Sequence, residues 1–162
     1  HLDSIVQGGN FDGAAGGIAG IAAVAALRAA GITPRRDVEV LALRCEEAVW
    51  FGLGLIGSRC MLARLPQGAL ELRHARTGKT LAESIALAGG DPEQLQQGKP
   101  LRDPAGIGAY LEIHIEQAPQ LIEAGMPVAI CLANPGNLRV DDAWIDVMVY
   151  IYEVIISNGG GG

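Results

Sequence analysis

The chain has 162 residues, with 12 Lys and Arg against 18 Asp and Glu, so its formal net charge is −6. This balance argues against nucleic-acid binding through a basic surface, and the high apolar content, 49% for the whole chain, argues against disorder in the first 135 residues. No stretch reaches the roughly 20 apolar residues that cross a bilayer, so no membrane partner is expected.

The first half of the chain predicts helices around one strand. Residues 12–30 are small and apolar, with apolar side chains every three positions, which predicts a helix buried on a sheet. Residues 38–45 are β-branched and apolar and predict a strand. Residues 55–65 predict a second helix, and residues 80–88 a third that begins with the capping signal of Thr80 and Glu83.

The second half predicts strands with one short helix between them. Residues 110–115 and 127–132 predict strands, and residues 119–124 a helix. Residues 143–156 are almost continuously apolar and β-prone. The order of elements favours an α/β domain with a mostly parallel sheet flanked by helices.

Three cysteines, an odd number without C-x-x-C spacing, indicate reduced thiols in a cytoplasmic protein. Cys45 lies beside Glu46, but no basic histidine is near it in the sequence. Nucleophilic catalysis by Cys45 is therefore disfavoured.

Polar clusters interrupt the apolar elements at four places. They are His1-Leu2-Asp3, residues 9–13, Glu46-Glu47 and residues 114–117. Imidazoles and carboxylates together suit Zn²⁺, Mn²⁺ or Co²⁺. Taken singly, each cluster also fits an ordinary role, as a helix cap, a turn or a hydrogen-bonded histidine in the core.

The ordered set of motifs is more specific than any one of them. The chain reads HLDS, GGNFDGAAG, EE, FGLGLIGSR and LEIHIEQ in that order. This set resembles the M20 metallopeptidase superfamily, in particular its amidohydrolase branch of N-carbamoyl-L-amino acid hydrolases and allantoate or ureidoglycolate amidohydrolases. The resemblance implies a zinc-peptidase-like catalytic domain, two divalent metal ions (Zn²⁺, or Mn²⁺, Co²⁺ or Ni²⁺), a small carbamoyl or ureido substrate and a cytoplasmic homodimer.

The resemblance also implies the metal ligands. His1, Glu47 and His114 match ligands, and Asp12 matches the carboxylate that bridges the two ions.

Three more residues match positions around the reaction. Glu46 matches the general acid/base that deprotonates the attacking water, and Asp3 the acid that orients His1; both are assigned to catalysis. Gln117 matches a residue that holds the carbamoyl group of the substrate.

The chain departs from the family pattern beside the site and toward its end. Residues 48–51 read AVWF where the family reads GSRF, and Ala118 replaces a glycine. The resemblance predicts a partial catalytic domain over residues 1–136, an unassigned apolar tail over 137–158 and a glycine tail over 159–162. The smaller lid domain and the fifth metal ligand of the family have no counterpart.

Three readings of function stay open. The first is a metal-dependent amidohydrolase that cleaves linear C–N bonds of N-carbamoyl-L-amino acids, or of allantoate or ureidoglycolate. The second is an inactive fragment that serves as a binding or oligomerising module, with residues 143–156 as the surface between copies. A dipeptidase of the same superfamily is less favoured, because the HIEQ and NFDG motifs match the amidohydrolase branch.

Overall fold

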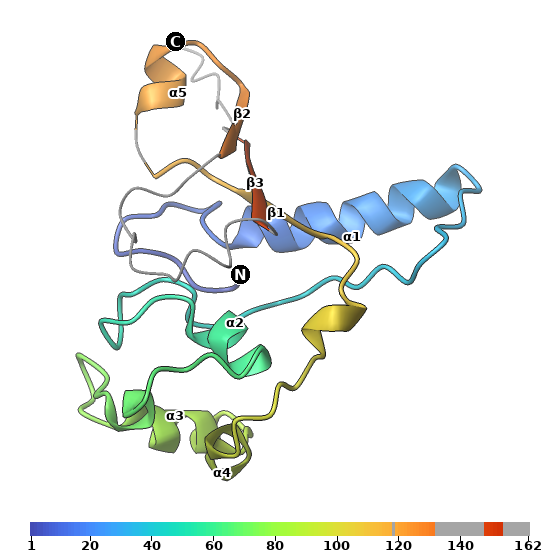
Figure 1. Cartoon of the computed structure of the whole chain (residues 1–162). Helices are drawn as coiled ribbons and strands as arrows, with labels where there is room; N and C mark the ends of the chain where they lie inside the picture. Colours follow the sequence, from blue (N-terminus) through green and yellow to red (C-terminus); the bar gives the residue numbers. More distant parts are fainter. Residues whose placement is uncertain (118, 132–147, 154–162) are drawn as a thin grey trace. The chain divides into compact units, whose positions relative to one another are not determined.

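The computed structural model describes residues 1–117, 119–131 and 148–153 (Figure 1). The chain divides into two compact units. Unit 1 comprises His1–Gly9 and Leu41–Ile107, and unit 2 comprises Asn10–Val40 and Gly108–Gly162.

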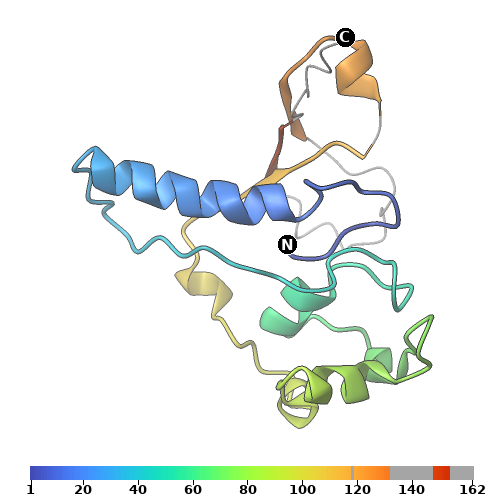
Figure 2. The same ribbon diagram turned by 180° about the vertical axis from the view of Figure 1, so that it is seen from behind.

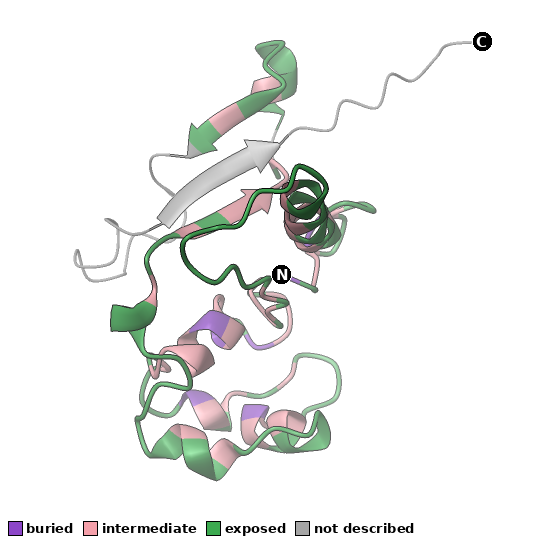
Figure 3. Cartoon of the chain, turned by 90° about the vertical axis from the view of Figure 1, so that its right-hand side faces the viewer, coloured by how far each residue is buried: buried purple, intermediate pink, exposed green. Residues whose placement is uncertain are grey.

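Unit 1 is built from short helices around a small apolar core. Its helices are α2 (Ile56–Met61), α3 (Leu81–Leu87) and α4 (Pro92–Gln96), with the 3₁₀ turns η1 (Ala69–Glu71) and η2 (Pro104–Gly106). Phe51, Ile56 and Leu81 form the buried cluster, and half-buried side chains such as Cys60 and Ile85 pack against it. Figure 3 marks the buried positions in purple.

Local hydrogen bonds explain where two of these helices begin. Thr80 and Glu83 form a complete capping box: Glu83 N donates to Thr80 Oγ1 at 3.1 Å, and Thr80 N donates to the Glu83 carboxylate at 2.7 Å. Asp91 accepts from the backbone N–H groups of Glu93 and Gln94 at the start of α4, where Pro92 occupies the first turn.

Unit 2 contains a three-stranded mixed sheet. Its strands are β1 (Tyr110–His114), β2 (Val128–Cys131) and β3 (Met148–Glu153), in the order β1-β3-β2. β3 pairs with β1 in parallel and with β2 antiparallel, so that Ile151 lies opposite both Ile113 and Ile130. The helix α5 (Gln120–Glu123) precedes β2.

The long helix α1 (Ala14–Ala29) packs against β1 through glycine. A Cβ on Gly16 would collide with the carbonyl oxygen of Ile113, and a Cβ on Gly20 would lie 3.0 Å from a methyl group of Val40. The segment after α1 runs back along the helix, as Figures 1 and 2 both show. The missing side chains of these glycines therefore allow the close approach.

Most of the predicted elements are confirmed. The helices expected over 12–30, 80–88 and 119–124 and the strands over 110–115 and 127–132 are present within two residues of their predicted limits. The helix expected over 55–65 is shorter, since α2 ends at Met61. Of the β-prone stretch 143–156, only β3 lies within the described residues; the remainder lies outside them.

Two expectations are wrong. Residues 38–45 form no strand, because this segment pairs with no strand in the described part of the chain; Leu43 O accepts a single hydrogen bond, from Leu2 N at 2.8 Å. The helix α1 is not buried all round, because its described neighbours cover only the side of Gly16 and Gly20. Ile18 and Ile21 remain 68% and 64% exposed.

The sheet is only partly as expected, since the parallel pairing is limited to β1 and β3 and β2 is antiparallel. None of the helices in the described part of the chain combines the length and the apolar character needed to span a bilayer.

Candidate metal-binding and catalytic residues

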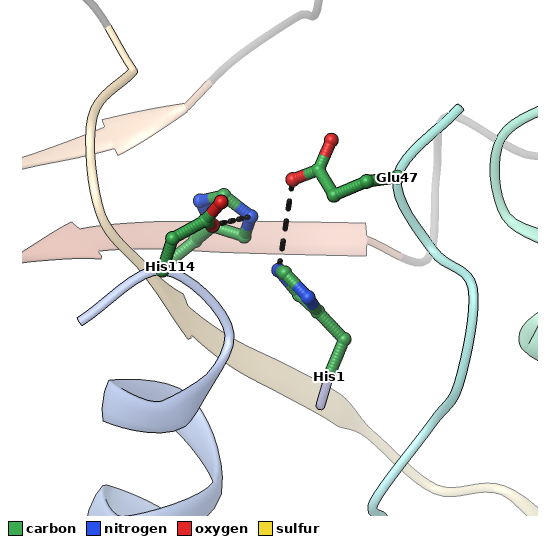
Figure 4. Close-up of side chains that lie close together, drawn as sticks. His1, Glu47 and His114 are labelled. Carbon is green, nitrogen blue, oxygen red and sulfur yellow. Dashed lines mark ion pairs between the residues drawn. The ribbon is translucent and has the colours of Figure 1, made fainter. Parts of the chain in front are cut away.

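In unit 1, the imidazole of His1 is buried and lies next to Glu47. His1 Nδ1 is 2.7 Å from the backbone carbonyl oxygen of Asp3, and Nε2 is 3.8 Å from Glu47 Oε1. Figure 4 shows this approach of the carboxylate to the ring.

The hydrogen bond fixes which nitrogen of His1 can bind a metal. A carbonyl oxygen only accepts, so Nδ1 carries the proton and the neutral ring presents the lone pair of Nε2. Metal-binding histidines typically have this arrangement, with the second nitrogen donating to a carbonyl or carboxylate. A separation of 3.8 Å is too long for a hydrogen bond, but it suits two ligands each about 2.0–2.2 Å from one ion.

Asp3 ties His1 to the two adjacent glutamates. Its carboxylate accepts from the backbone N–H groups of Glu46 at 3.0 Å and of Glu47 at 2.9 Å. Burial alone would raise the pKa of the Asp3 carboxyl, but the nearby His1 ring and the hydrogen bonds from the backbone N–H groups of Glu47 and Glu46 outweigh it and lower the pKa to about 2. The orientation of His1 by the Asp3 carboxylate stays a prediction, since His1 Nδ1 contacts the backbone carbonyl of Asp3 at 2.7 Å and the carboxylate lies 3.7 Å away. What the Asp3 carboxylate does hold is the backbone of residues 46–47.

Glu46 points to a different neighbour from Glu47. Ser58 N donates to Glu46 Oε1 and Ser58 Oγ donates to Glu46 Oε2, both at 2.8 Å. Ser58 was not among the candidate residues of the sequence analysis, although it lies in the quoted FGLGLIGSR motif. Ser58 and Glu46 are 12 residues apart, and such a contact produces no periodic pattern in the sequence. The motif that contains Ser58 was therefore the one sequence signal for it.

In unit 2, His114 and Asp12 form a second histidine–carboxylate pair. His114 Nδ1 is 2.6 Å from the carbonyl oxygen of Ile115, and Nε2 is 3.8 Å from Asp12 Oδ1. Asp12 is buried, and His114 ends β1. Figure 4 includes the His114 side chain. By the argument made for His1, this pair also presents an Nε2 lone pair beside a carboxylate.

Gln117 lies beside the same carboxylate. Its Nε2 donates to Asp12 Oδ1 at 3.4 Å, whereas the neighbouring Glu116 accepts from Leu121 N in α5 at 2.8 Å. Of the two polar residues in the HIEQ motif that follow the histidine, Gln117 is therefore the one that faces the candidate ligand.

The thiols of unit 1 are unsuited to nucleophilic catalysis. Burial, together with the charges of Asp3 and Glu46, raises the pKa of Cys45. Burial, together with the charge of Glu46, raises that of Cys60 to about 11. A thiol with a raised pKa carries little of the reactive thiolate at neutral pH.

The third histidine packs with aromatic rings. His74 stacks on Trp50 with ring centroids 5.0 Å apart, meets Phe51 edge-on, and its Nδ1 accepts from the backbone N–H groups of Arg76 and Thr77. His74 is half-buried. These contacts give it a structural role in the turn that follows it.

Comparisons with known proteins agree with the motif resemblance. The model of the peptidase family M20/M25/M40 matches residues 5–158. An N-carbamoyl-L-amino acid amidohydrolase of Geobacillus stearothermophilus is 45% identical over 140 residues, which cover 86% of this chain and 34% of that protein. Allantoate deiminase 1 of Glycine max is 32% identical over 86% of this chain and 29% of its own length.

A solved structure shows the same relationship. The crystal structure of a hydantoinase/carbamoylase family amidase from Burkholderia ambifaria superposes with a TM-score of 0.62 and 33% identity, over 80% of this chain and 30% of that one. The chain thus spans about a third of the length of these relatives. The family match covers nearly the whole sequence, and the chain belongs to the peptidase family M20/M25/M40.

Proposed function

We propose that this chain is part of a metal-dependent amidohydrolase that hydrolyses the linear C–N bond of N-carbamoyl-L-amino acids. The observation that carries the proposal is the pair of histidine–carboxylate sets, one in each unit. In both, Nδ1 is held by a backbone carbonyl and Nε2 lies 3.8 Å from a carboxylate oxygen. The similarity to an enzyme named N-carbamoyl-L-amino acid amidohydrolase supports the substrate class.

His1 and Glu47 from unit 1, with Asp12 and His114 from unit 2, are the proposed ligands of two divalent ions. Two nitrogen and two carboxylate donors fit Zn²⁺, Mn²⁺, Co²⁺ or Ni²⁺. Such ions polarise a carbonyl group and lower the pKa of water. We propose this ligand set, and we also propose that the catalytic domain has a mostly parallel sheet.

Glu46 is the proposed general base, Asp3 is proposed to position it, and Gln117 is proposed to bind the substrate. Glu46 takes a proton from the attacking water and gives it to the leaving nitrogen. Asp3 holds the backbone of residues 46–47 through two hydrogen bonds, and Gln117 offers its side-chain amide to the carbamoyl group. One water is consumed, and the amino acid, ammonia and carbon dioxide are released.

Metal stoichiometry of the purified chain, measured by elemental analysis, is the test. We expect about two equivalents of metal per chain, fewer in Glu47→Ala, and no change in the matched control Glu71→Ala, whose side chain is exposed in η1. Absence of bound metal after incubation with Zn²⁺ or Mn²⁺ would contradict the proposal and favour a non-catalytic module.

Substrate assays then separate the two branches of the amidohydrolases. Release of ammonia from N-carbamoyl-L-amino acids in preference to allantoate would support the proposed substrate. The reverse preference would assign the chain to the allantoate enzymes, to which it is also similar.

A further inference from the structure

Ser58 holds the carboxylate of Glu46 at both oxygens. The backbone N–H and the hydroxyl of Ser58 each donate to a different oxygen at 2.8 Å, and Ser58 is only 9% exposed. Hydrogen bonds to an ionised acceptor are roughly twice as strong as neutral ones. Two of them to one carboxylate fix both its position and its rotation.

The chain around Ser58 is shaped to bring it against Glu46. Leu55 N donates to Glu46 O at 2.8 Å, and Ile56 N donates to Cys45 O at 2.9 Å. A Cβ on Gly57 would lie 2.5 Å from Arg44 O and 2.9 Å from Glu46 Oε1. Only glycine at position 57 allows this approach, so the closeness of the two segments is built into the sequence.

Unusual backbone conformations flank the same contact. Cys45, directly before Glu46, has φ 55°, and Leu55, at the start of α2, has φ 60°. Left-handed conformations cost energy in residues with a side chain, and they persist where surrounding contacts enforce them. Here the enforcing contacts are the hydrogen bonds between residues 45–46 and 55–56.

The two adjacent glutamates are chemically alike but have different partners. The carboxylate of Glu47 approaches Nε2 of His1, whereas that of Glu46 is bound by Ser58. A carboxylate has about four acceptor positions, so two hydrogen bonds to Glu46 are compatible with its also accepting a proton. They do oppose rotation of Glu46 toward a metal ion.

We propose that Ser58 is a positioning residue that keeps Glu46 out of the metal coordination, so that Glu47 is the ligand and Glu46 remains the base. This inference rests on the proposed function. Removal of the Ser58 hydroxyl leaves the bond from the Ser58 backbone N–H to one Glu46 oxygen and releases the other oxygen from Ser58. Glu46 is then able to turn and take the place of Glu47 as a ligand.

A double-mutant cycle on metal binding tests the assignment, with Mn²⁺ titrated into the full chain by calorimetry. In the wild-type background, Glu47→Gln is expected to weaken Mn²⁺ binding by about 10-fold or more. In the Ser58→Ala background the same change is expected to cost less than about threefold, because Glu46 substitutes as ligand. In the Ser58→Thr background, which keeps the hydroxyl, Glu47→Gln is expected to weaken Mn²⁺ binding by the same factor as in the wild type.

A purely structural role for Ser58 gives a different outcome. Damage to folding would add to the effect of Glu47→Gln instead of reducing it. An equal loss on Glu47→Gln in the wild-type and Ser58→Ala backgrounds would therefore overturn the proposal.

An NMR measurement tests the contact without any metal. The Ser58 amide proton is expected at low field and is expected to move upfield in Glu46→Gln, because a neutral acceptor replaces a charged one. The control Glu71→Gln should leave it in place. An unmoved Ser58 signal in Glu46→Gln would overturn the proposal, while a chain that binds no Mn²⁺ but shows the shift would refute the proposed function alone.

Discussion

The two units present a histidine and a carboxylate in the same way but support them differently. In both, a backbone carbonyl holds Nδ1, and Nε2 lies 3.8 Å from a carboxylate oxygen. In unit 1, Asp3 and Ser58 form four hydrogen bonds with Glu46 and Glu47. The same unit has a buried core of Phe51, Ile56 and Leu81. In unit 2, none of the apolar side chains that the structure describes is buried.

The two units therefore differ in how far their own contacts stabilise them. Unit 1 fixes its polar groups through contacts among its own short helices and turns. Unit 2 has a helix with exposed isoleucines and strands with exposed Leu111, Val128 and Ile130, so its described part buries little apolar surface to stabilise it. The His1–Glu47 pair should accordingly tolerate less change around it than the His114–Asp12 pair.

The sharpest way to break unit 1 is to fill the space at Gly57. Gly57→Ala places a methyl group 2.5 Å from Arg44 O and 2.9 Å from Glu46 Oε1, and we expect it to lower the free energy of unfolding by about 3 kcal/mol. Urea unfolding followed by circular dichroism measures the loss. The matched control is Gly106→Ala, where the added Cβ meets no atom within 4 Å; equal effects at the two sites would disprove the close contact.

In unit 2, the corresponding test is a pair of neighbouring glycines in α1. Gly16→Ala pushes a methyl group into the carbonyl of Ile113 and should destabilise the chain by about 1–2 kcal/mol, as α1 and β1 separate slightly. Gly17→Ala meets nothing within 4 Å and should stabilise the helix by about 0.5–1 kcal/mol. Thermal unfolding of both variants gives the comparison, and two changes of the same sign would show that α1 does not pack on β1 through Gly16.

Local signals predicted the fold well where one segment contains the whole cause. The capping box of α3 needs only Thr80 and Glu83. The apolar alternation of residues 110–115 predicts β1, which also has a partner strand in β3. The strand expected over 38–45 failed because a strand requires a neighbouring ladder, which no local pattern reveals. The exposure of Ile18 and Ile21 was missed for the same reason, since periodicity cannot show how much chain covers a helix.

The candidate site also contains residues that the sequence identifies and a contact that only the structure reveals. Motif resemblance identified His1, Asp3, Asp12, Glu46, Glu47, His114 and Gln117, and the pairs His1–Glu47 and His114–Asp12 lie together within their own units. Their roles remain predictions. The bond from Ser58 to Glu46 depends on a close approach at Gly57, which becomes visible only in three dimensions.

A smaller effect is expected at the edge of unit 1, in the capping box of α3. Thr80→Ala removes the acceptor for Glu83 N and should cost about 1 kcal/mol of stability in urea unfolding. Thr77→Ala, on the exposed turn before it, is the control and should change stability by less than about 0.5 kcal/mol. If Thr77→Ala proved as costly as Thr80→Ala, the capping box would not be what starts this helix.

The last effect is a change of stability at alkaline pH, and it concerns Cys60, which packs against the core of unit 1. Burial, together with the charge of Glu46, raises its pKa from 9.0 to about 11. A pKa that is higher in the folded than in the unfolded chain means that the neutral thiol favours folding. This contribution is complete below pH 9 and is lost as the pH rises toward 11, where the unfolded chain releases the proton first. We therefore expect the urea midpoint of the wild type to fall over this range more steeply than that of Cys60→Ala, and equal slopes would show that the thiol is not held in the apolar core.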